Sequence, residues 1–182
     1  APLCGSKEVY PPPPPTWGPS MFLQLLLTTA LAQDVQEGDL IFHTSLTSQS
    51  EAIQLATNSP FSHVGIVTIE NGQPMVYEAI RRVSATPLQE WIRRGEGGRY
   101  RLMRLKTALT EEQLSAMRIE GQEHRSKSYD LLFDWSDEKM YCSELVWKIY
   151  QEGAGIELAK RTAVCTSEEK LLLTAASSRR PV

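Results

Sequence analysis

The sequence predicts an α+β domain in which helices flank a small antiparallel sheet. Residues 62–67 and 76–80 are short, apolar and β-branched, and the dipeptide Asn71-Gly72 between them is a strong signal for a two-residue hairpin turn. Residues 86–89 and 110–113 each match the capping-box pattern that begins a helix. Consecutive strands joined by a hairpin argue against a parallel sheet built from βαβ units.

The composition is that of an ordinary globular protein. The chain has 182 residues, of which 41% are hydrophobic and 23% charged, enough for one domain with a hydrophobic core. The net charge is −3 and no long basic run is present, so a nucleic-acid partner is not expected. The 3 histidines lie far apart and no Cys or His pair has zinc-site spacing, so neither a metal nor a cofactor is expected.

The N-terminal segment looks separate from the domain. Residues 1–20 include the polyproline run 11–15 and are expected to be a disordered leader or upstream read-through. Residues 21–32 are apolar and end in Ala30-Leu31-Ala32, the small-residue pattern of a cleaved signal peptide, although no Lys or Arg closely precedes them. We interpret them as a signal peptide, with a hydrophobic helix packed on the domain as the alternative. The protein is then periplasmic or secreted, and otherwise cytoplasmic.

Residues 33–160 are expected to form the folded domain, and residues 161–182 a C-terminal tail to which we assign no structure. The elements expected around the hairpin are, in chain order, a strand at 38–42, a helix at 50–57 capped by Ser48 or Ser50, a helix from 86 to Gly95, a strand at 99–105 and a helix from 110 to about 121.

The hairpin determines which side chains share a face of the sheet. A two-residue loop pairs Glu70 with Gln73. Because side chains alternate along a strand, His63 and Glu78 then lie on one face as diagonal neighbours, about 7–8 Å apart at the backbone. Gly65, opposite Glu78, leaves space between them. A histidine satisfied by hydrogen bonds in a core is the alternative, but an acid and a histidine on one face are more specific than either alone.

Cys142 stands at the first turn of a predicted amphipathic helix that ends near Gly153. Apolar residues follow it at the spacing of one helical face, at Leu145, Val146, Ile149 and Tyr150. Backbone N–H groups at a helix N-terminus favour negative charge and so favour the reactive thiolate. The alternative is a buried structural cysteine.

A thiol, an imidazole and a carboxylate are the groups of a cysteine hydrolase. The thiol attacks an acyl carbon, the imidazole takes and returns the proton, and the carboxylate orients the imidazole ring. The order along this chain is His63, Glu78 and Cys142, the reverse of the papain order, in which the cysteine comes first.

At these residues the sequence resembles the permuted NlpC-type, papain-like cysteine hydrolases, in particular the YiiX/YebB-like group. The resemblance covers about residues 37–158, and its matching stretches include Phe61-Ser62-His63-Val64-Gly65 and Tyr141-Cys142-Ser143-Glu144. It implies a circularly permuted papain-like fold for residues 33–160. It also implies Cys142 as nucleophile, His63 as base, Glu78 as the orienting partner, and Tyr141 as an oxyanion or substrate contact.

We therefore expect a thiol hydrolase that cleaves an amide or ester bond through an acyl-enzyme. One alternative is an acyltransferase, in which a hydroxyl or amine replaces water, as in the related lecithin:retinol acyltransferase-type enzymes. Another is a non-catalytic small-ligand or lipid-binding domain, against which the presence of all three residue types argues. The expected partners are a small acyl amide or ester, a lipid or a peptide.

Residues near these motifs predict the character of the pocket. The site is predicted between one helix and a small sheet, which favours a narrow pocket, and the elements around it carry Phe61, Tyr77, Trp135 and Tyr141. We therefore expect an apolar acyl chain or a small amide to be accepted ahead of a folded protein. Tyr129 and Trp135 are further candidates for lining the pocket, but core packing is the preferred interpretation of Trp135. A group of arginines is either solvated surface or a rim for a carboxylate or an anionic lipid headgroup at a membrane surface: Arg81, Arg82, Arg93, Arg94, Arg99, Arg101 and Arg104.

Overall fold

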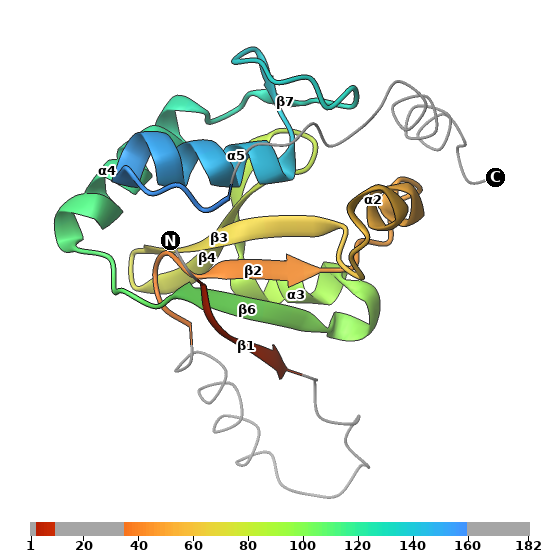
Figure 1. Ribbon diagram of the computed structural model, residues 1–182, viewed down its shortest axis with the longest axis horizontal. Helices are drawn as coiled ribbons and strands as arrows, with labels where there is room; N and C mark the ends of the chain where they lie inside the picture. The colour runs from red at the N-terminus through yellow and green to blue at the C-terminus, as the bar shows by residue number, and fades with distance from the viewer. Residues whose placement is uncertain (1–2, 10–34, 160–182) are drawn as a thin grey trace, which may run out of the picture.

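The computed structural model describes residues 3–9 and 35–159 of the chain. Its main sheet has six strands in the order β1-β6-β2-β3-β4-β5, and all neighbouring strands are antiparallel (Figure 1). A separate parallel pair joins β7 to β8. The strands are β1 (Leu3–Val9), β2 (Leu40–His43), β3 (His63–Glu70), β4 (Gln73–Ala79), β5 (Val83–Pro87), β6 (Tyr100–Leu105), β7 (Ser128–Tyr129) and β8 (Lys139–Met140).

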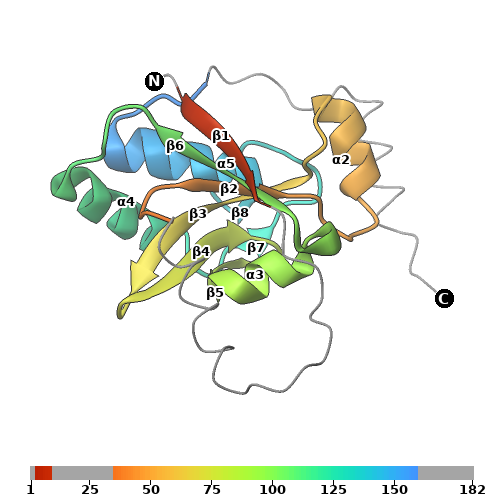
Figure 2. The ribbon, with the colours of Figure 1, turned by 90° about the horizontal axis from the view of Figure 1, so that it is seen from below.

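Helices cover both faces of the main sheet. Figures 1 and 2 show α4 and α5 on one face and α3 on the opposite face. The helical elements are α2 (Ser50–Thr57), α3 (Leu88–Arg94), the short 3₁₀ turn η1 (Glu96–Gly98), α4 (Glu111–Glu123), α5 (Cys142–Lys148) and the π-helical turn η2 (Ile149–Gly153), which continues α5. The predicted α+β class, an antiparallel sheet flanked by helices, is confirmed.

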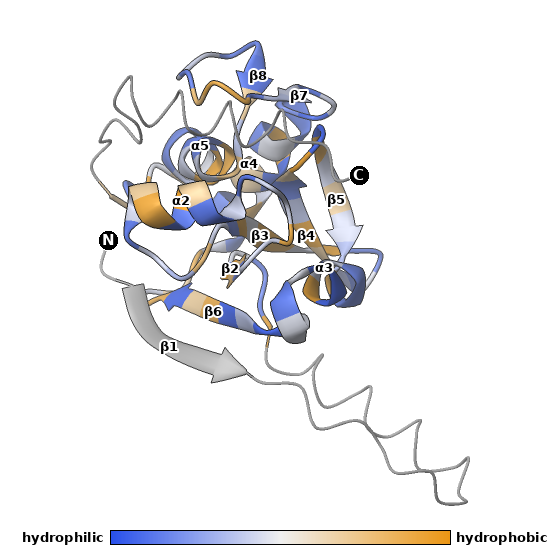
Figure 3. Cartoon of the chain, turned by 90° about the vertical axis from the view of Figure 1, so that its right-hand side faces the viewer, coloured by the Kyte–Doolittle hydropathy of each residue, from blue (hydrophilic) through white to orange (hydrophobic). Residues whose placement is uncertain are grey.

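Each face of the sheet has its own hydrophobic cluster. The cluster under α5 contains Val64, Ile66, Tyr77, Ala79, Leu145 and Val146. The cluster under α3 contains Ile41, Val67, Val76, Leu88, Trp91 and Ile92. Successive residues of β3 and β4 thus alternate between the two faces, as the strand period of two requires. Both hydrophobic and hydrophilic residues occur along β6 (Figure 3). His63 and Glu78 have the same parity as Val67 and Val76, so they belong to the α3 face.

The hairpin between β3 and β4 has the predicted register. Glu70 pairs with Gln73, and Ile66 pairs with Tyr77. The two residues of the Asn71-Gly72 loop both have positive φ, 51° and 75°, which a type I′ turn needs and which Asn and Gly adopt more readily than other residues.

The predicted helix caps have mixed outcomes. The capping box at residues 110–113 is present at the start of α4. The prediction for α2 is wrong, because neither Ser48 nor Ser50 is its cap: Gln49 is the N-cap and makes no side-chain cap hydrogen bond. The hydroxyl of Ser50 instead shares a 2.7 Å hydrogen bond with the hydroxyl of Ser62, which ties α2 to the chain just before β3.

Thr86 does not cap α3 either. Pro87 is the N-cap of that helix and makes no side-chain cap hydrogen bond. The hydroxyl of Thr86 is directed to Glu78 instead, at 2.6 Å. Thr86 and Pro87 end β5, a strand that the sequence pattern did not predict, whereas Gly95 follows the end of α3 as predicted.

The N-terminal residues that the structure describes form a strand. Residues 3–9 are β1, which pairs with the outer edge of β6 and differs from the disordered leader expected there. The physical reason is that the edge strand β6 presents N–H and C=O groups with which an extended segment such as β1 can form backbone hydrogen bonds. The polyproline run, the expected signal peptide at 21–32 and the tail at 161–182 lie outside the described residues. Among the helices described, none has the length and apolar character needed to cross a bilayer.

Candidate active site

His63 and Glu78 are hydrogen-bonded to each other. Nε2 of His63 lies 2.6 Å from Oε2 of Glu78. The two residues are 7% and 0% exposed. His63 begins β3 and Glu78 is the next-to-last residue of β4, so the pair stands at one end of the hairpin strands. The sheet therefore fixes both groups beside the start of β3.

Glu78 has further partners that keep it charged. Its Oε1 accepts a 2.6 Å hydrogen bond from the hydroxyl of Thr86 and forms an ion pair with Arg94 of α3. Burial alone raises the pKa of Glu78, but the contacts with His63, Thr86 and Arg94 outweigh burial and lower the pKa below its usual value. Glu78 is consequently a carboxylate at neutral pH, able to accept from the ring of His63.

Cys142 is the first residue of α5 and carries a free thiol. Its sulfur hydrogen-bonds with His63 and with the backbone at Val64 and Ser143. Burial raises the pKa of the thiol, but the hydrogen bond and charge of His63, together with the backbone contacts, lower the pKa overall. Because Nε2 of His63 is held by Glu78, Nδ1 is the ring nitrogen left for the thiol.

His63 has the opposite shift. Burial alone lowers the pKa of His63, but its hydrogen bonds to Cys142 and Glu78 and their charges raise the pKa to about 9. A lowered thiol pKa and a raised imidazole pKa favour a thiolate–imidazolium pair at neutral pH. The structure thus brings together the three residues that the sequence singles out, in an arrangement suited to nucleophilic attack on an acyl carbon.

The tyrosine hydroxyl at the thiol belongs to Tyr129. It hydrogen-bonds with Cys142, and burial together with the nearby thiolate raises the pKa of Tyr129 well above its usual value, so the hydroxyl keeps its proton. Tyr141 is buried against Phe133, with ring centroids 5.3 Å apart, and its backbone N–H donates to Oε2 of Glu144 at 3.4 Å. The sequence predicts Tyr129 only as a pocket-lining residue, because its contact with the thiol depends on how the segment before β8 folds.

A second histidine, which the sequence did not point to, lies beside the first. His43 pairs with His63 across β2 and β3, and their ring centroids are 5.3 Å apart. The ring of His43 also stacks on Trp91 of α3 at 3.9 Å. Burial and the charge of His63 lower the pKa of His43 to about 3, so this ring is neutral. The predicted strand at 38–42 ended one residue before His43, and extending it would have revealed this neighbour.

Several apolar side chains in the segment that precedes Cys142 are partly exposed to solvent. Trp135 is 40% exposed, and its ring packs edge-on against Tyr141 and Trp147, with centroids 6.4 Å and 5.1 Å away. Leu131 and Leu132, in the same connection between β7 and β8, are 45% and 49% exposed. Trp135 is therefore not a core residue and flanks the aromatic wall that contains Tyr141.

Tyr77 and three of the arginines make contacts within the chain itself. Tyr77 faces away from the triad, because its hydroxyl donates to the backbone oxygen of Gly121 at 2.5 Å within the cluster under α5. Arg94, Arg99 and Arg104 each form an ion pair with a carboxylate of the chain itself. These three guanidinium groups are thus already engaged and contribute less to a rim for anionic ligands.

Comparisons with known proteins identify the family and fold of the chain. Residues 34–169 match the family described as permuted papain-like amidase enzymes, YaeF/YiiX, C92 family. The chain is 42% identical over 142 residues to a protein of Escherichia coli (strain K12) named "Uncharacterized protein YiiX", and the match covers 78% of this chain and 70% of that protein. A crystal structure of the "metalloprotein yiiX" from Escherichia coli O157:H7 is similar with a TM-score of 0.67 and 44% identity, covering 69% of each chain.

The family match includes all three residues of the candidate triad and nearly all of the described domain. The papain-like fold expected from the sequence is confirmed by the family and by the similar crystal structure. The chain belongs to the permuted papain-like amidase family of YaeF and YiiX.

Proposed function

We propose that the protein is a cysteine hydrolase that cleaves an amide or ester bond, with Cys142 as nucleophile, His63 as base and acid, and Glu78 as the orienting carboxylate. The observation that carries the proposal is the continuous hydrogen-bonded chain from the sulfur of Cys142 through the ring of His63 to Glu78. Charged thiolate and imidazolium groups at neutral pH suit this chemistry. The description of the family as amidases supports the same class of reaction.

In the proposed first step, the thiolate of Cys142 attacks the acyl carbon and the C=O electron pair moves onto the oxygen. The tetrahedral intermediate collapses as His63 gives its proton to the leaving amine or alcohol, which leaves a thioester on the sulfur. A water molecule then gives a proton to His63 and attacks the thioester. Collapse of the second intermediate releases the carboxylic acid and restores the thiolate–imidazolium pair.

We assign Tyr129 as the donor to the oxyanion. Its hydroxyl lies at the sulfur that attacks and keeps its proton, so it can donate to the oxygen on which charge develops. Removing one such donor lowers kcat by about 10²–10³-fold in well-studied acyl-transfer enzymes. Tyr141, which the family resemblance places in this role, is assigned to the aromatic wall beside the nucleophile.

The proposed substrate has an apolar acyl chain. Leu131, Leu132 and Trp135 present partly exposed apolar surface in the connection that leads to the nucleophile helix. Cys142 itself is only 7% exposed, which favours a slender acyl chain or a small amide over a folded protein.

The test compares turnover of medium-chain acyl esters and acyl amides with turnover of casein and cell-wall muropeptides. Intact-mass spectrometry during turnover should show a mass increase equal to the acyl group on the wild-type chain and none on Cys142→Ala, while Cys165→Ala serves as the matched control and keeps the adduct. Turnover by Cys142→Ala at the wild-type rate would contradict the function. Muropeptide cleavage without acyl-ester turnover would contradict the substrate and leave the cysteine mechanism in place.

A further inference from the structure

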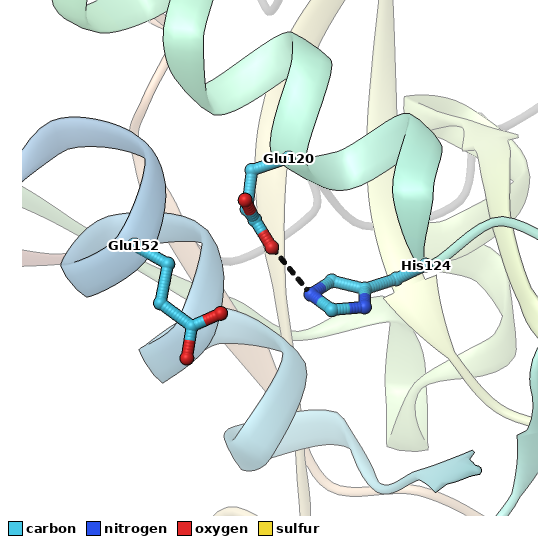
Figure 4. A group of neighbouring side chains, drawn as sticks. All are labelled: Glu120, His124 and Glu152. Carbon is cyan, nitrogen blue, oxygen red and sulfur yellow. Dashed lines mark ion pairs between the residues drawn. The ribbon is translucent and has the colours of Figure 1, made fainter. Parts of the chain in front are cut away.

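Three side chains outside the proposed triad converge where α4 meets η2 (Figure 4). Glu120 and His124 stand four residues apart at the end of α4 and therefore on one face of the helix, and Glu152 comes from the neighbouring turn η2. One ligand atom from each of the three lies within 4.8 Å of the other two. We propose that Glu120, His124 and Glu152 bind a divalent transition-metal ion such as zinc.

His124 distinguishes this group from an ordinary acidic surface cluster. The residue is 4% exposed, and its buried Nε2 makes no hydrogen bond although Oε1 of Glu120 lies 2.9 Å away. An imidazole nitrogen that is buried, makes no hydrogen bond and is directed at a carboxylate is well placed to ligate a metal ion.

The two carboxylates add a need for positive charge. The carboxylates of Glu120 and Glu152 lie within 4.8 Å of each other, so their negative charges repel. A cation between them relieves this repulsion. Zinc binds nitrogen and carboxylate oxygen at about 2.0–2.2 Å, so ligand atoms that now lie within 4.8 Å of one another must move closer together to share one ion. Glu152, which is exposed, is free to make most of that movement.

The donor set selects the class of metal. Magnesium and calcium take oxygen ligands almost entirely, whereas zinc and its neighbours bind imidazole nitrogen together with carboxylate oxygen. Three protein ligands leave a fourth position for water. The sequence does not indicate this site, because one histidine and two glutamates from separate helical segments have none of the Cys and His spacing that is typical of a zinc site.

Lys127 competes with the metal ion for the histidine. Its Nζ lies 2.9 Å from Nδ1 of His124, and because an ammonium group only donates, Nδ1 holds a lone pair and the ring proton is on Nε2. For a metal ion to bind Nε2, the ring proton must move from Nε2 to Nδ1. Lys127 must then turn toward solvent, because an ammonium group cannot accept a hydrogen bond from a protonated Nδ1. Replacing Lys127 by methionine is therefore expected to tighten metal binding.

The metal would join the end of α4 to the segment that continues the nucleophile helix. η2 is a π-helical turn, a rare conformation that often occurs at functional sites, and it places Glu152 beside α4. Because a ligand that binds only the folded state stabilises it, zinc at 100-fold over its Kd should raise Tm by about 5–10 °C.

The experiment is isothermal titration calorimetry and thermal unfolding of the full chain with its 3 cysteines replaced by serine, so that no thiolate binds the probe metal. We expect one zinc ion per chain, the rise in Tm, and no comparable binding of magnesium. Glu152→Gln and Glu120→Gln should each weaken zinc binding at least about tenfold, since each removes one of three ligands. Glu123→Gln is the matched control, because it removes the same charge next to His124 without removing a ligand, and it should bind as the parent does.

Three results would overturn the proposal. The first is a parent chain that binds no zinc, and the second is zinc binding by Glu152→Gln or Glu120→Gln as tight as that of the parent. The third is magnesium binding as tight as zinc binding, which would show that the imidazole of His124 is not a ligand. Weaker zinc binding by Lys127→Met would contradict the competition between Lys127 and the metal.

Discussion

The hydroxyl of Thr86 donates a 2.6 Å hydrogen bond to Oε1 of Glu78, the oxygen that also pairs with Arg94. The other oxygen of the same carboxylate lies 2.6 Å from Nε2 of His63. Glu78 is thus held by β5 and α3 on one side and by the imidazole on the other. The orientation of His63 consequently depends on Thr86 and Arg94, which act on it through Glu78.

Thr86→Val is expected to lower kcat about tenfold, because a hydrogen bond to a charged group contributes about 1.5–3 kcal/mol and its loss frees the carboxylate to turn. Thr86→Ser keeps the hydroxyl and should retain most of the activity. Steady-state kinetics on the best acyl substrate measures both. Full activity in the valine variant would show that Thr86 has no positioning role.

Glu78→Gln is expected to shift the alkaline limb of the kcat/KM profile to lower pH. Glu78 and Cys142 together raise the pKa of His63 to about 9, so removing the negative charge of Glu78 lowers that pKa and the imidazolium is lost at lower pH. Residual activity should remain in Glu78→Gln, whereas His63→Ala should be inactive. The profile is measured from about pH 5 to 10. An alkaline limb at the wild-type position would show that Glu78 does not act on His63.

His43 is expected to make the fold sensitive to acid. Burial and the charge of His63 lower its pKa from 6.5 to about 3, so between these values the unfolded chain binds a proton that the folded chain does not. The contribution of His43 to stability is therefore complete above the unfolded pKa and is lost as pH falls toward the folded one. His43→Phe keeps a ring against Trp91 and should show a smaller loss of stability on acidification. Urea unfolding at a series of pH values tests this, and an identical loss in both proteins would contradict it.

Gly65→Ala is expected to lower the free energy of unfolding by about 1–3 kcal/mol through overpacking. A Cβ at this position would lie 2.4 Å from Cγ1 of Val76 and 2.9 Å from the backbone oxygen of Tyr77, so β3 and β4 must move apart. Ser115→Ala, an exposed change on α4, is the control and should shift stability by less than about 0.5 kcal/mol. A stability of Gly65→Ala equal to that of the control would show that the strands have room to adjust.

The parts of the site that could be predicted from the sequence depend on local signals. Asn71-Gly72 determines the loop length, the loop length determines the register, and the register places His63 and Glu78 on one face. Cys142 precedes a regular apolar periodicity, which gives the start of its helix.

The remaining parts depend on how elements distant in sequence pack together. The sequence around Thr86 favours a helix cap. Its hydroxyl instead hydrogen-bonds to Glu78, because β4 and β5 pair and bring the two residues together. Arg94 resembles any basic residue at a helix end until α3 packs on the sheet. The position of Tyr129 depends on how the chain folds between α4 and β8. The position of His43 depends on β2 being one residue longer than predicted.

The most direct test of the thiolate–imidazolium pair is the pH dependence of iodoacetamide alkylation at Cys142, followed by peptide mass mapping that separates it from Cys4 and Cys165. We predict a midpoint well below the value of about 8.5 for an ordinary thiol in the wild-type chain. In His63→Ala the midpoint should rise, because burial then raises the pKa of the thiol without an imidazolium to oppose it. An ordinary midpoint in both proteins, or an inert Cys142 beside a faster-labelling Cys165 at neutral pH, would contradict the assignment of Cys142 as the nucleophile.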